Sequence, residues 1–178
     1  MTIARIRALA IVGALFVAAV VLVTISITKD NQTKPVGASC PKDAVRANTH
    51  LDDAENIQLN VYNATDKPGL AKEIASELKQ RKFKVDPEKA NNDPLGKSVD
   101  GVAVLRYGPK TVGAAWVVRA YFLNDATLEF DINRTDESVD VVLGRGFKKL
   151  ATQTEKQQSL AQAGRAGLPK GTCDARTP

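Results

Sequence analysis

The sequence predicts an α+β domain that follows one N-terminal transmembrane helix, and three observations carry this prediction. An uncharged apolar run fills residues 8–27. A strand–helix–strand pattern then occurs twice in succession between residues 57 and 132. One more apolar strand pattern follows at residues 139–143. The 178 residues suffice for one domain of ordinary size with extensions and argue against two full domains.

The apolar run at 8–27 has the length that an α-helix needs to cross the hydrocarbon core of a bilayer. A cleaved signal peptide is the alternative, but its apolar region has about 7–15 residues and ends in a small-x-small site, which residues 28–31 lack. Arg5 and Arg7 precede the run, and the positive-inside rule keeps them in the cytoplasm. We therefore expect residues 1–28 to form a cytoplasmic stub and a single-pass membrane anchor, with the rest of the chain extracytoplasmic.

Residues 29–56 are polar, contain two prolines and one glycine, and have no sustained apolar period, so they are predicted to form an extracytoplasmic linker. The chain has two cysteines, Cys40 in this linker and Cys173 near the other end of the sequence. Outside the membrane such a pair is expected to form one disulfide bond. Two unpaired thiols are the alternative.

The first strand–helix–strand unit begins directly after the linker. Residues 57–62 alternate apolar and polar side chains, as a half-buried strand does. Pro68 and Gly69 then open a helix in which apolar residues recur every three or four positions and which is expected to end near Arg81. Residues 83–85 are the second, short strand of the unit.

The second unit repeats this order. Residues 102–107 are rich in β-branched side chains and predict a strand. Gly108 and Pro109 interrupt it, residues 112–123 have apolar positions at helical spacing, and residues 127–132 alternate again. Two helices on one face of such a sheet predict a ferredoxin-like βαββαβ sandwich, to which the pattern at 139–143 adds an extra strand.

The predicted domain spans residues 57–149, and residues 150–178 are a polar C-terminal tail with a weak helical pattern at 150–163. The chain carries 25 Lys and Arg against 20 Asp and Glu, a net charge of +5. This surplus is too small and too evenly spread for nucleic-acid binding. The predicted strands also lack the interleaved aromatic residues of an RNA-binding sheet.

Five motifs occur in a fixed order along the chain: V-Y-N-A-T at 61–65, P-G-L-A at 68–71, R-K-F-K-V at 81–85, R-Y-G-P at 106–109 and V-V-L-G at 141–144. In this order and spacing, over residues 57–149, the chain resembles the LytR C-terminal domain (LytR_C) family. Ala64 and Lys82 stand where the family commonly has glycine. Because glycine adopts left-handed conformations at no steric cost, we expect these two turns to be shaped differently here.

The family occurs behind LytR-CpsA-Psr catalytic domains and also alone on a single membrane anchor. The resemblance therefore implies an anchored extracytoplasmic protein that supports cell-envelope and cell-wall integrity as a non-catalytic binding or scaffold module. The implied partners are the membrane, peptidoglycan or another wall glycopolymer, and LytR-CpsA-Psr-type or other envelope proteins. The resemblance implies no reaction, and from the residues we expect no cofactor and no metal.

Six residues at the two strand-to-helix turns are the candidate ligand-binding residues: Asn63, Thr65, Asp66, Gly69, Arg106 and Tyr107. The amides of a first helical turn lack intrahelical acceptors and can hold a carboxylate or a phosphate. The competing interpretation is ordinary turn and capping chemistry.

An enzyme that acts on envelope glycopolymers is the alternative function. Glu129 and Asp131 are its candidate acid/base pair, because residues two apart lie on one face of a strand. The adjacent Asp52 and Asp53 lie in the predicted linker and are not expected to converge. His50, the single histidine, also lies there, and no metal-ligand spacing occurs. The sequence therefore favours the binding module over the enzyme.

Overall fold

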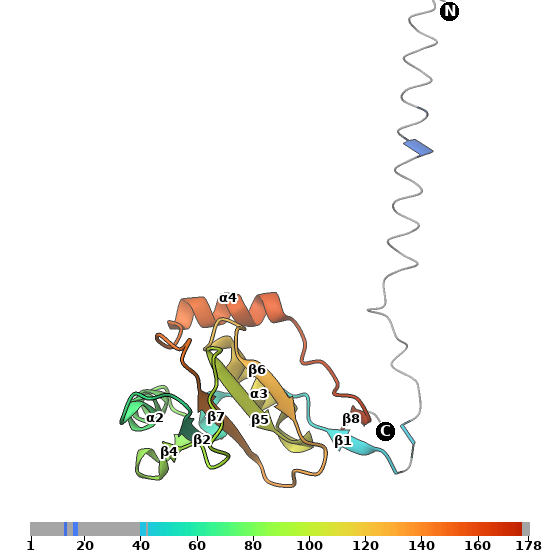
Figure 1. Ribbon diagram of the computed structural model, residues 1–178. Coiled ribbons are helices and arrows are strands. Elements are labelled where there is room, and N and C mark those ends of the chain that lie inside the picture. Colours follow the sequence, from blue (N-terminus) through green and yellow to red (C-terminus); the bar gives the residue numbers. More distant parts are fainter. Residues whose placement is uncertain (1–12, 14–15, 18–39, 42, 176–178) are drawn as a thin grey trace, which may run out of the picture. The chain divides into compact units, whose positions relative to one another are not determined.

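The computed structural model describes residues 13, 16–17, 40–41 and 43–175 (Figure 1). The chain divides into two units, residues 1–38 and residues 39–178, and nearly all described residues belong to the second. The transmembrane helix predicted at residues 8–27 thus lies outside the described residues, apart from three positions. Among the described helices, none combines the length and the apolar character that a bilayer span requires.

The second unit contains both predicted strand–helix–strand units and the additional strand. In chain order its elements are β1 (Val45–Ala47), the 3-10 helix η1 (Ala54–Asn56), β2 (Gln58–Asn63), α2 (Leu70–Gln80), β3 (Lys84–Val85), the 3-10 helix η2 (Pro87–Lys89), β4 (Asn91–Asn92), β5 (Ala103–Tyr107), the 3-10 helix η3 (Pro109–Thr111), α3 (Val112–Ala120), β6 (Thr127–Phe130), β7 (Ser138–Leu143), α4 (Gln153–Ala163) and β8 (Thr172–Asp174). The predicted α+β class is confirmed.

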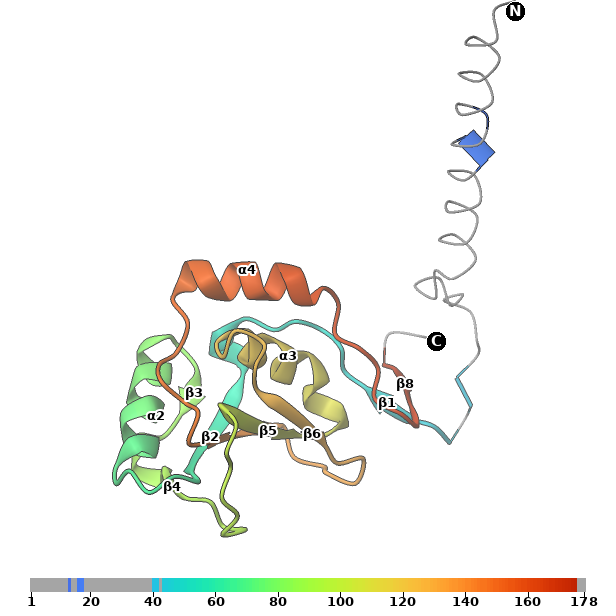
Figure 2. The ribbon, with the colours of Figure 1, turned by 45° about the horizontal axis from the view of Figure 1, so that its top comes forward.

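The main sheet has the strand order β3-β2-β7-β5-β6, and β4 pairs with the end of β2 (Figure 2). The two strands of each unit are parallel, β2 to β3 and β5 to β6. Strand β7 lies between the two strand–helix–strand units, parallel to β2 of the first and antiparallel to β5 of the second. A ferredoxin-like sheet would place β5 directly beside β2, so the predicted ferredoxin-like order is not the order of this sheet.

The composition of β7 explains its central place. Val139, Val141, Val142 and Leu143 are completely buried, and these residues include neighbours that point to opposite faces of the sheet. Apolar residues on both faces favour a place inside the sheet, where both edges of the strand are paired. The sequence pattern predicted this strand but did not show that it lies between the two strand–helix–strand units.

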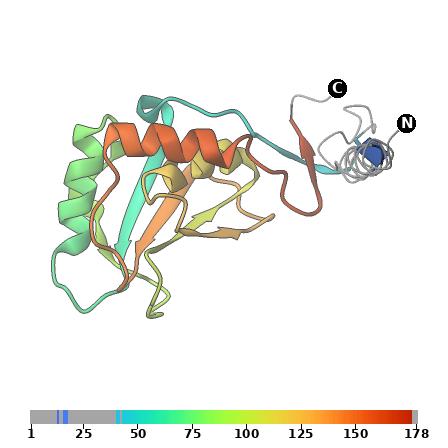
Figure 3. The same ribbon diagram turned by 90° about the horizontal axis from the view of Figure 1, so that it is seen from above.

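Helices α2 and α3 pack on the same face of the sheet and form one core with it. The stripe of α2 that faces this core is Leu70, Ala71, Ile74, Ala75 and Leu78. From the sheet, Leu59, Leu105 and Val141 are almost completely buried beneath the helices. Burial of each such side chain contributes about 1.5–3 kcal/mol. Helix α4 packs against α3 (Figure 3).

The turn after α2 keeps a glycine-type conformation without a glycine. Lys82 has a φ of 72°, in the left-handed region. Its amide donates to the carbonyl of Lys79, and the amide of Phe83 donates to that of Leu78, which is a Schellman ending. The expectation of a differently shaped turn is therefore wrong at Lys82. Ala64 is not among the described residues with positive φ.

Residues 43–56 and 164–175, which we call the terminal strap, belong to the folded unit. Strands β1 and β8 pair in parallel, with Arg46 opposite Cys173. Cys173 forms a disulfide bond with Cys40, as predicted. Two backbone hydrogen bonds connect the strap to η3 and α3. The amide of Asn48 donates to the carbonyl of Pro109, and the carbonyl of Asn48 accepts from the amide of Gly113.

The folded unit is thus larger than the predicted domain of residues 57–149. Residues 43–56 carry β1 and η1 instead of a free linker, and Ala47 is completely buried. The predicted tail carries α4 and β8, so it too is part of the fold. Thr152 and Glu155 begin α4 with a reciprocal capping box.

Candidate functional site

The first predicted ligand turn uses its side chains internally. Asn63 is buried, its Oδ1 accepts hydrogen bonds from the amide and hydroxyl of Thr65 at 3.0 and 2.7 Å, and its Nδ2 donates to the carbonyl of Lys67 at 2.8 Å. The hydroxyl of Thr65 accepts from the amide of Lys67 at 3.1 Å. These bonds are the turn chemistry that competed with the ligand interpretation.

Asp66 and Gly69 complete this turn. Gly69 has a φ of 77° and precedes α2, and its carbonyl accepts from the amide of Glu73. Asp66 is almost fully exposed, with its carboxylate 3.8 Å from Nε of Arg145. Asn63, Thr65 and Asp66 line a shallow pocket of about 180 Å³ together with Asp93. Lys97 also lines this pocket and Asp93 is paired with Arg106, so the charges of the lining do not select an anionic ligand.

Arg106 and Tyr107 are neighbours on β5 and therefore point to opposite faces of the sheet. Tyr107 lies in the core beside Phe130, with ring centroids 5.6 Å apart, and burial raises the pKa of its hydroxyl. Arg106 lies on the face without helices. The structure therefore does not bring these two side chains to one site.

Arg106 is held by two carboxylates. Its guanidinium donates to both oxygens of Asp93 at 2.6 and 3.0 Å and to Glu129 at 3.1 Å. The side chain of Asp93 is only 2% exposed, and the hydrogen bond from Arg106 lowers its pKa. The same bond raises the pKa of Arg106. Both groups thus stay ionised and fixed in place.

A second arginine organises the neighbouring strand. Arg134 donates to both oxygens of Asp140 at 2.8 and 3.0 Å, to Asp136 at 2.9 Å and to the hydroxyl of Ser138 at 3.0 Å. It also reaches the carbonyl of Arg106 at 3.2 Å, which links the two arginine clusters. The bond with Asp140 raises the pKa of Arg134. Burial opposes ionisation of Asp136, yet hydrogen bonds from Arg134 and Ser138 lower its pKa.

Strand β2 extends the network across the sheet. Asn60 donates from Nδ2 to Ser138 at 3.0 Å and to Asp140 at 2.8 Å. Tyr62 follows on the same face, and burial, aided by the charge of Asp140, raises the pKa of its hydroxyl. We call this surface the polar face, and its residues are Asn60, Tyr62, Asp93, Arg106, Glu129, Arg134, Asp136, Ser138 and Asp140. Its four carboxylates outnumber its two guanidinium groups.

The candidate catalytic residues do not converge on one point. Glu129 pairs with Arg106, whereas Asp131 accepts a hydrogen bond from the amide of Asn133 in the turn after β6. His50 is exposed, with Nε2 3.8 Å from Asp52. The shifted carboxyl pKa values in the described part, those of Asp93, Asp136 and Glu155, are all lowered, the opposite of what a glycosidase acid requires. The described residues contain no group of three or more potential metal ligands.

Sequence reasoning missed most of the polar face. It singled out Arg106 and Glu129 but not Asp93, Arg134 or Asp140. Asp140 lies at a polar position of an alternating strand, which is a signal for the solvent-facing side of a sheet. Nothing in the linear spacing connects Arg106 with Asp93 or Arg134, because a loop and a turn bring these residues together.

Comparison with known proteins finds one matching family and similar proteins of two mycobacteria. The sequence model of LytR_C, described as LytR cell envelope-related transcriptional attenuator, matches residues 56–147. The Cell envelope integrity protein Cei of Mycobacterium tuberculosis is 32% identical over 108 residues, which cover 60% of this chain and 48% of that protein. The chain thus spans about half the length of the curated relative that it matches.

A solved structure has a similar fold. It is the soluble domain of a conserved hypothetical secreted protein from Mycobacterium marinum. The two share 27% sequence identity with a TM-score of 0.52, over 74% of this chain and 82% of that chain. The sequence match of the LytR_C family, at 56–147, spans β2 to β7 and so includes the strands of the polar face.

Proposed function

The chain belongs to the LytR_C family, and from this premise we propose that it is an extracytoplasmic protein that supports cell-envelope and cell-wall integrity. In this proposal the folded unit is a non-catalytic binding or scaffold module for a wall polymer, with envelope-assembly proteins as further partners. The descriptions of its relatives, a cell envelope integrity protein and a secreted protein, support this role.

The polar face is the observation that carries the binding role. Its charged side chains are fixed by one another before any ligand arrives, so a ligand would meet ordered carboxylate acceptors and little side-chain freedom would be lost on binding. Glu129 and Asp136 are about half exposed and can accept hydrogen bonds from hydroxyl groups. A hydroxyl-rich polymer suits this surface better than a polyanion, because carboxylates predominate on it.

The same features favour binding over catalysis. Arg106 and Arg134 are saturated by their carboxylates, and Glu129 and Asp131 serve different contacts. An acid/base pair for glycoside hydrolysis needs two carboxyl groups across one substrate bond and one pKa raised. The enzyme alternative therefore has no specific observation in its favour among the described residues.

We infer that residues 8–27 anchor the chain in the cell membrane, with the N-terminus in the cytoplasm and the folded unit outside. The Cys40–Cys173 disulfide supports an oxidising, extracytoplasmic compartment. A fluorescent topology reporter fused after Pro178 should be silent in the cytosol, and fluorescence there would contradict the orientation.

Co-sedimentation with purified cell wall tests the binding role. The chain is expected to pellet with the wall, and Thr127→Arg, which places a bulky cation on an exposed position of β6, should reduce the pelleted fraction. Gln80→Arg on α2 makes the same charge change on an exposed position of the helical side and should have no effect. No pelleting, together with no wall or envelope partner after crosslinking in cells, would remove the support for this function.

Rescue of a deletion strain separates the two function classes. Asp131→Ala removes one carboxyl group of the candidate acid/base pair at a position outside the polar face, so this variant should restore envelope integrity if the domain acts by binding. Loss of rescue, with normal amounts of folded protein and unchanged pelleting with cell wall, would favour the enzyme alternative.

A further inference from the structure

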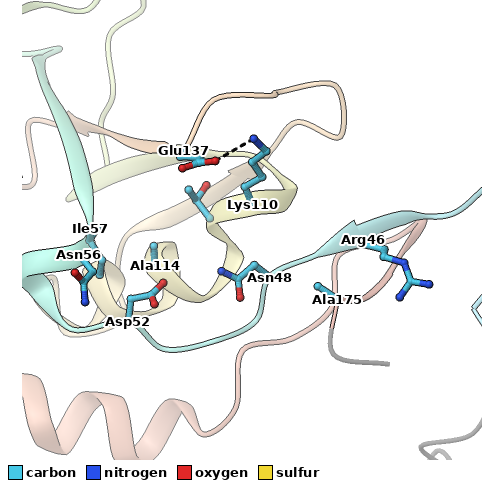
Figure 4. A pocket seen from close by; sticks show the side chains of 10 residues that line it. Arg46, Asn48, Asp52, Asn56, Ile57, Lys110, Ala114, Glu137 and Ala175 are labelled. Carbon is cyan, nitrogen blue, oxygen red and sulfur yellow. Dashed lines mark hydrogen bonds and ion pairs between the residues drawn. The ribbon is translucent and has the colours of Figure 1, made fainter. Parts of the chain in front are cut away.

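A second candidate binding site lies outside the polar face, where the terminal strap meets the start of α3 (Figure 4). It is a pocket of about 370 Å³, which is within the size range of small-ligand sites. Its walls come from β1 and η1, from η3 and α3, and from the turn before β7. Most of its polar groups lie in residues 46–56.

The floor of the pocket is apolar and its rim is polar. Ile57 and Ala114 are buried at the floor. Asn48, Asp52 and Asn56 lie along one side, and the ion pair of Lys110 with Glu137, at 3.0 Å, lies across from them (Figure 4). This arrangement offers amide donors, a carboxylate acceptor and a small apolar surface within one cavity.

The side chain of Asn48 is oriented before a ligand binds. Its Oδ1 accepts a hydrogen bond from the amide of His50 at 3.0 Å, while its Nδ2 has no hydrogen-bond partner among the described residues. The side chain of Asp52 is 31% exposed, and its one ion pair among the described residues is with Nε2 of His50, at 3.8 Å. An amide N–H and a carboxylate on one wall can bind two adjacent hydroxyl groups, one as acceptor and one as donor.

The charges around the pocket balance. Lys110 is neutralised by Glu137, and Arg46 and Asp52 contribute one charge of each sign. Such a site gives no net attraction for a phosphate or a polycation. The geometry points to a neutral saccharide unit as ligand, held by Asn48, Asp52 and Asn56 over the floor of Ile57 and Ala114. This inference rests on the proposed function, since it assigns one subsite for a sugar of the wall polymer.

The disulfide positions this wall of the pocket. Cys40 and Cys173 fasten β1 to β8, and the backbone of Asn48 is hydrogen-bonded to Pro109 and Gly113. Release of the strap would move three of the polar groups away from Lys110 and Ala114. Sugar affinity should therefore fall when the disulfide is reduced.

The test is titration of the full-length chain in detergent with N,N′-diacetylchitobiose and with maltose, followed by NMR of the side-chain amides. Saturable shifts of the Asn48 and Asn56 amide signals are expected at concentrations up to about 10 mM. Asp52→Ala and Asn56→Ala should each weaken binding about tenfold. Asp53→Ala is the matched control, because the Asp53 side chain makes no capping bond and does not line the pocket. Inorganic phosphate should cause no saturable shift.

The outcomes distinguish the two proposals. If the chain pellets with cell wall but neither sugar shifts these signals, the pocket assignment is wrong and the binding function stands. If the chain neither pellets nor binds either sugar, both proposals fail. Equal sugar affinities of Asp52→Ala, Asn56→Ala and Asp53→Ala, in variants with unchanged backbone spectra, would also overturn the assignment.

Discussion

The helix-covered sheet and the terminal strap belong to one folded unit but are held by different forces. The sheet and its helices bury a continuous apolar core, to which Leu59, Leu105 and Val141 contribute. The strap contributes Ala47 to that core, and its Ala54 and Ala166 are partly buried against it. It is fastened by a three-residue strand pair, a few backbone hydrogen bonds and one disulfide. Because the strap is held by a few contacts between residues far apart in the sequence, a single substitution should be enough to release it.

Removal of the disulfide is expected to have the largest effect. In the chain-entropy model a cross-link between residues 133 positions apart contributes about 4–5 kcal/mol to the free energy of unfolding. Urea unfolding of Cys40→Ser/Cys173→Ser should show this loss, while limited proteolysis should cut the strap before the sheet. Unchanged stability, or first cleavage within the sheet, would contradict the division into two regions.

A truncation in the core should cost nearly as much and loosen both regions together. Leu105 is completely buried beneath the helices, so Leu105→Ala should lower the free energy of unfolding by about 2–5 kcal/mol. Val45→Ala in β1 is the counterpart in the strap. Because Val45 is already 36% exposed, its loss should cost less than about 1 kcal/mol in the same urea experiment.

The contact between strap and α3 can be broken at one glycine. A Cβ on Gly113 would lie 1.8 Å from the backbone carbonyl oxygen of His50, so Gly113→Ala must displace the strap. We expect a loss of about 1–3 kcal/mol and faster amide exchange at Gly113. Gly167→Ala, in a strap position with open space around it, is the control and should be nearly neutral. Similar losses for both variants would mean that the strap does not rest on α3.

Acid should loosen the sheet through its polar face. The pKa values of Asp93 and Asp136 are lowered in the folded state, so their contribution is present above the unfolded pKa of about 4 and is lost as pH falls through the folded values. Stability should therefore decrease below about pH 5, and Asp93→Asn should flatten that decrease. Equal slopes for both proteins in urea unfolding at pH 3 to 7 would argue against this assignment.

The smallest expected change is an increase in stability, at the turn after α2. Lys82 occupies the left-handed position after α2, where glycine has no steric penalty. Lys82→Gly should raise the free energy of unfolding by about 0.5–1 kcal/mol. Ala64→Gly, the other position where the family commonly has glycine, should bring no such gain, since Ala64 does not have a positive φ. A destabilised Lys82→Gly would show that the Lys82 side chain matters more than its backbone.

The candidate site was only partly predictable. Arg106 and Glu129 stood out as charged residues of predicted strands, and the turn at Asn63 to Gly69 was identified by its motif. The roles of these residues were not evident from the sequence, because the role of a guanidinium depends on the carboxylates with which it pairs in the folded protein. Asp93 comes from a loop, and Arg134 comes from the turn before β7.

The sequence alone determined the elements whose information is local: the apolar stripe of α2, the alternation in β2, the break at Gly108 and Pro109, and the family motifs along 57–149. The tertiary structure alone decided the central place of β7, the seating of residues 43–56 on α3 and the assembly of the polar face. The physical reason is the separation in sequence between the residues that make the deciding contacts. Periodicity records which side of an element is buried, whereas strand order and charge pairing depend on contacts between residues far apart in the chain.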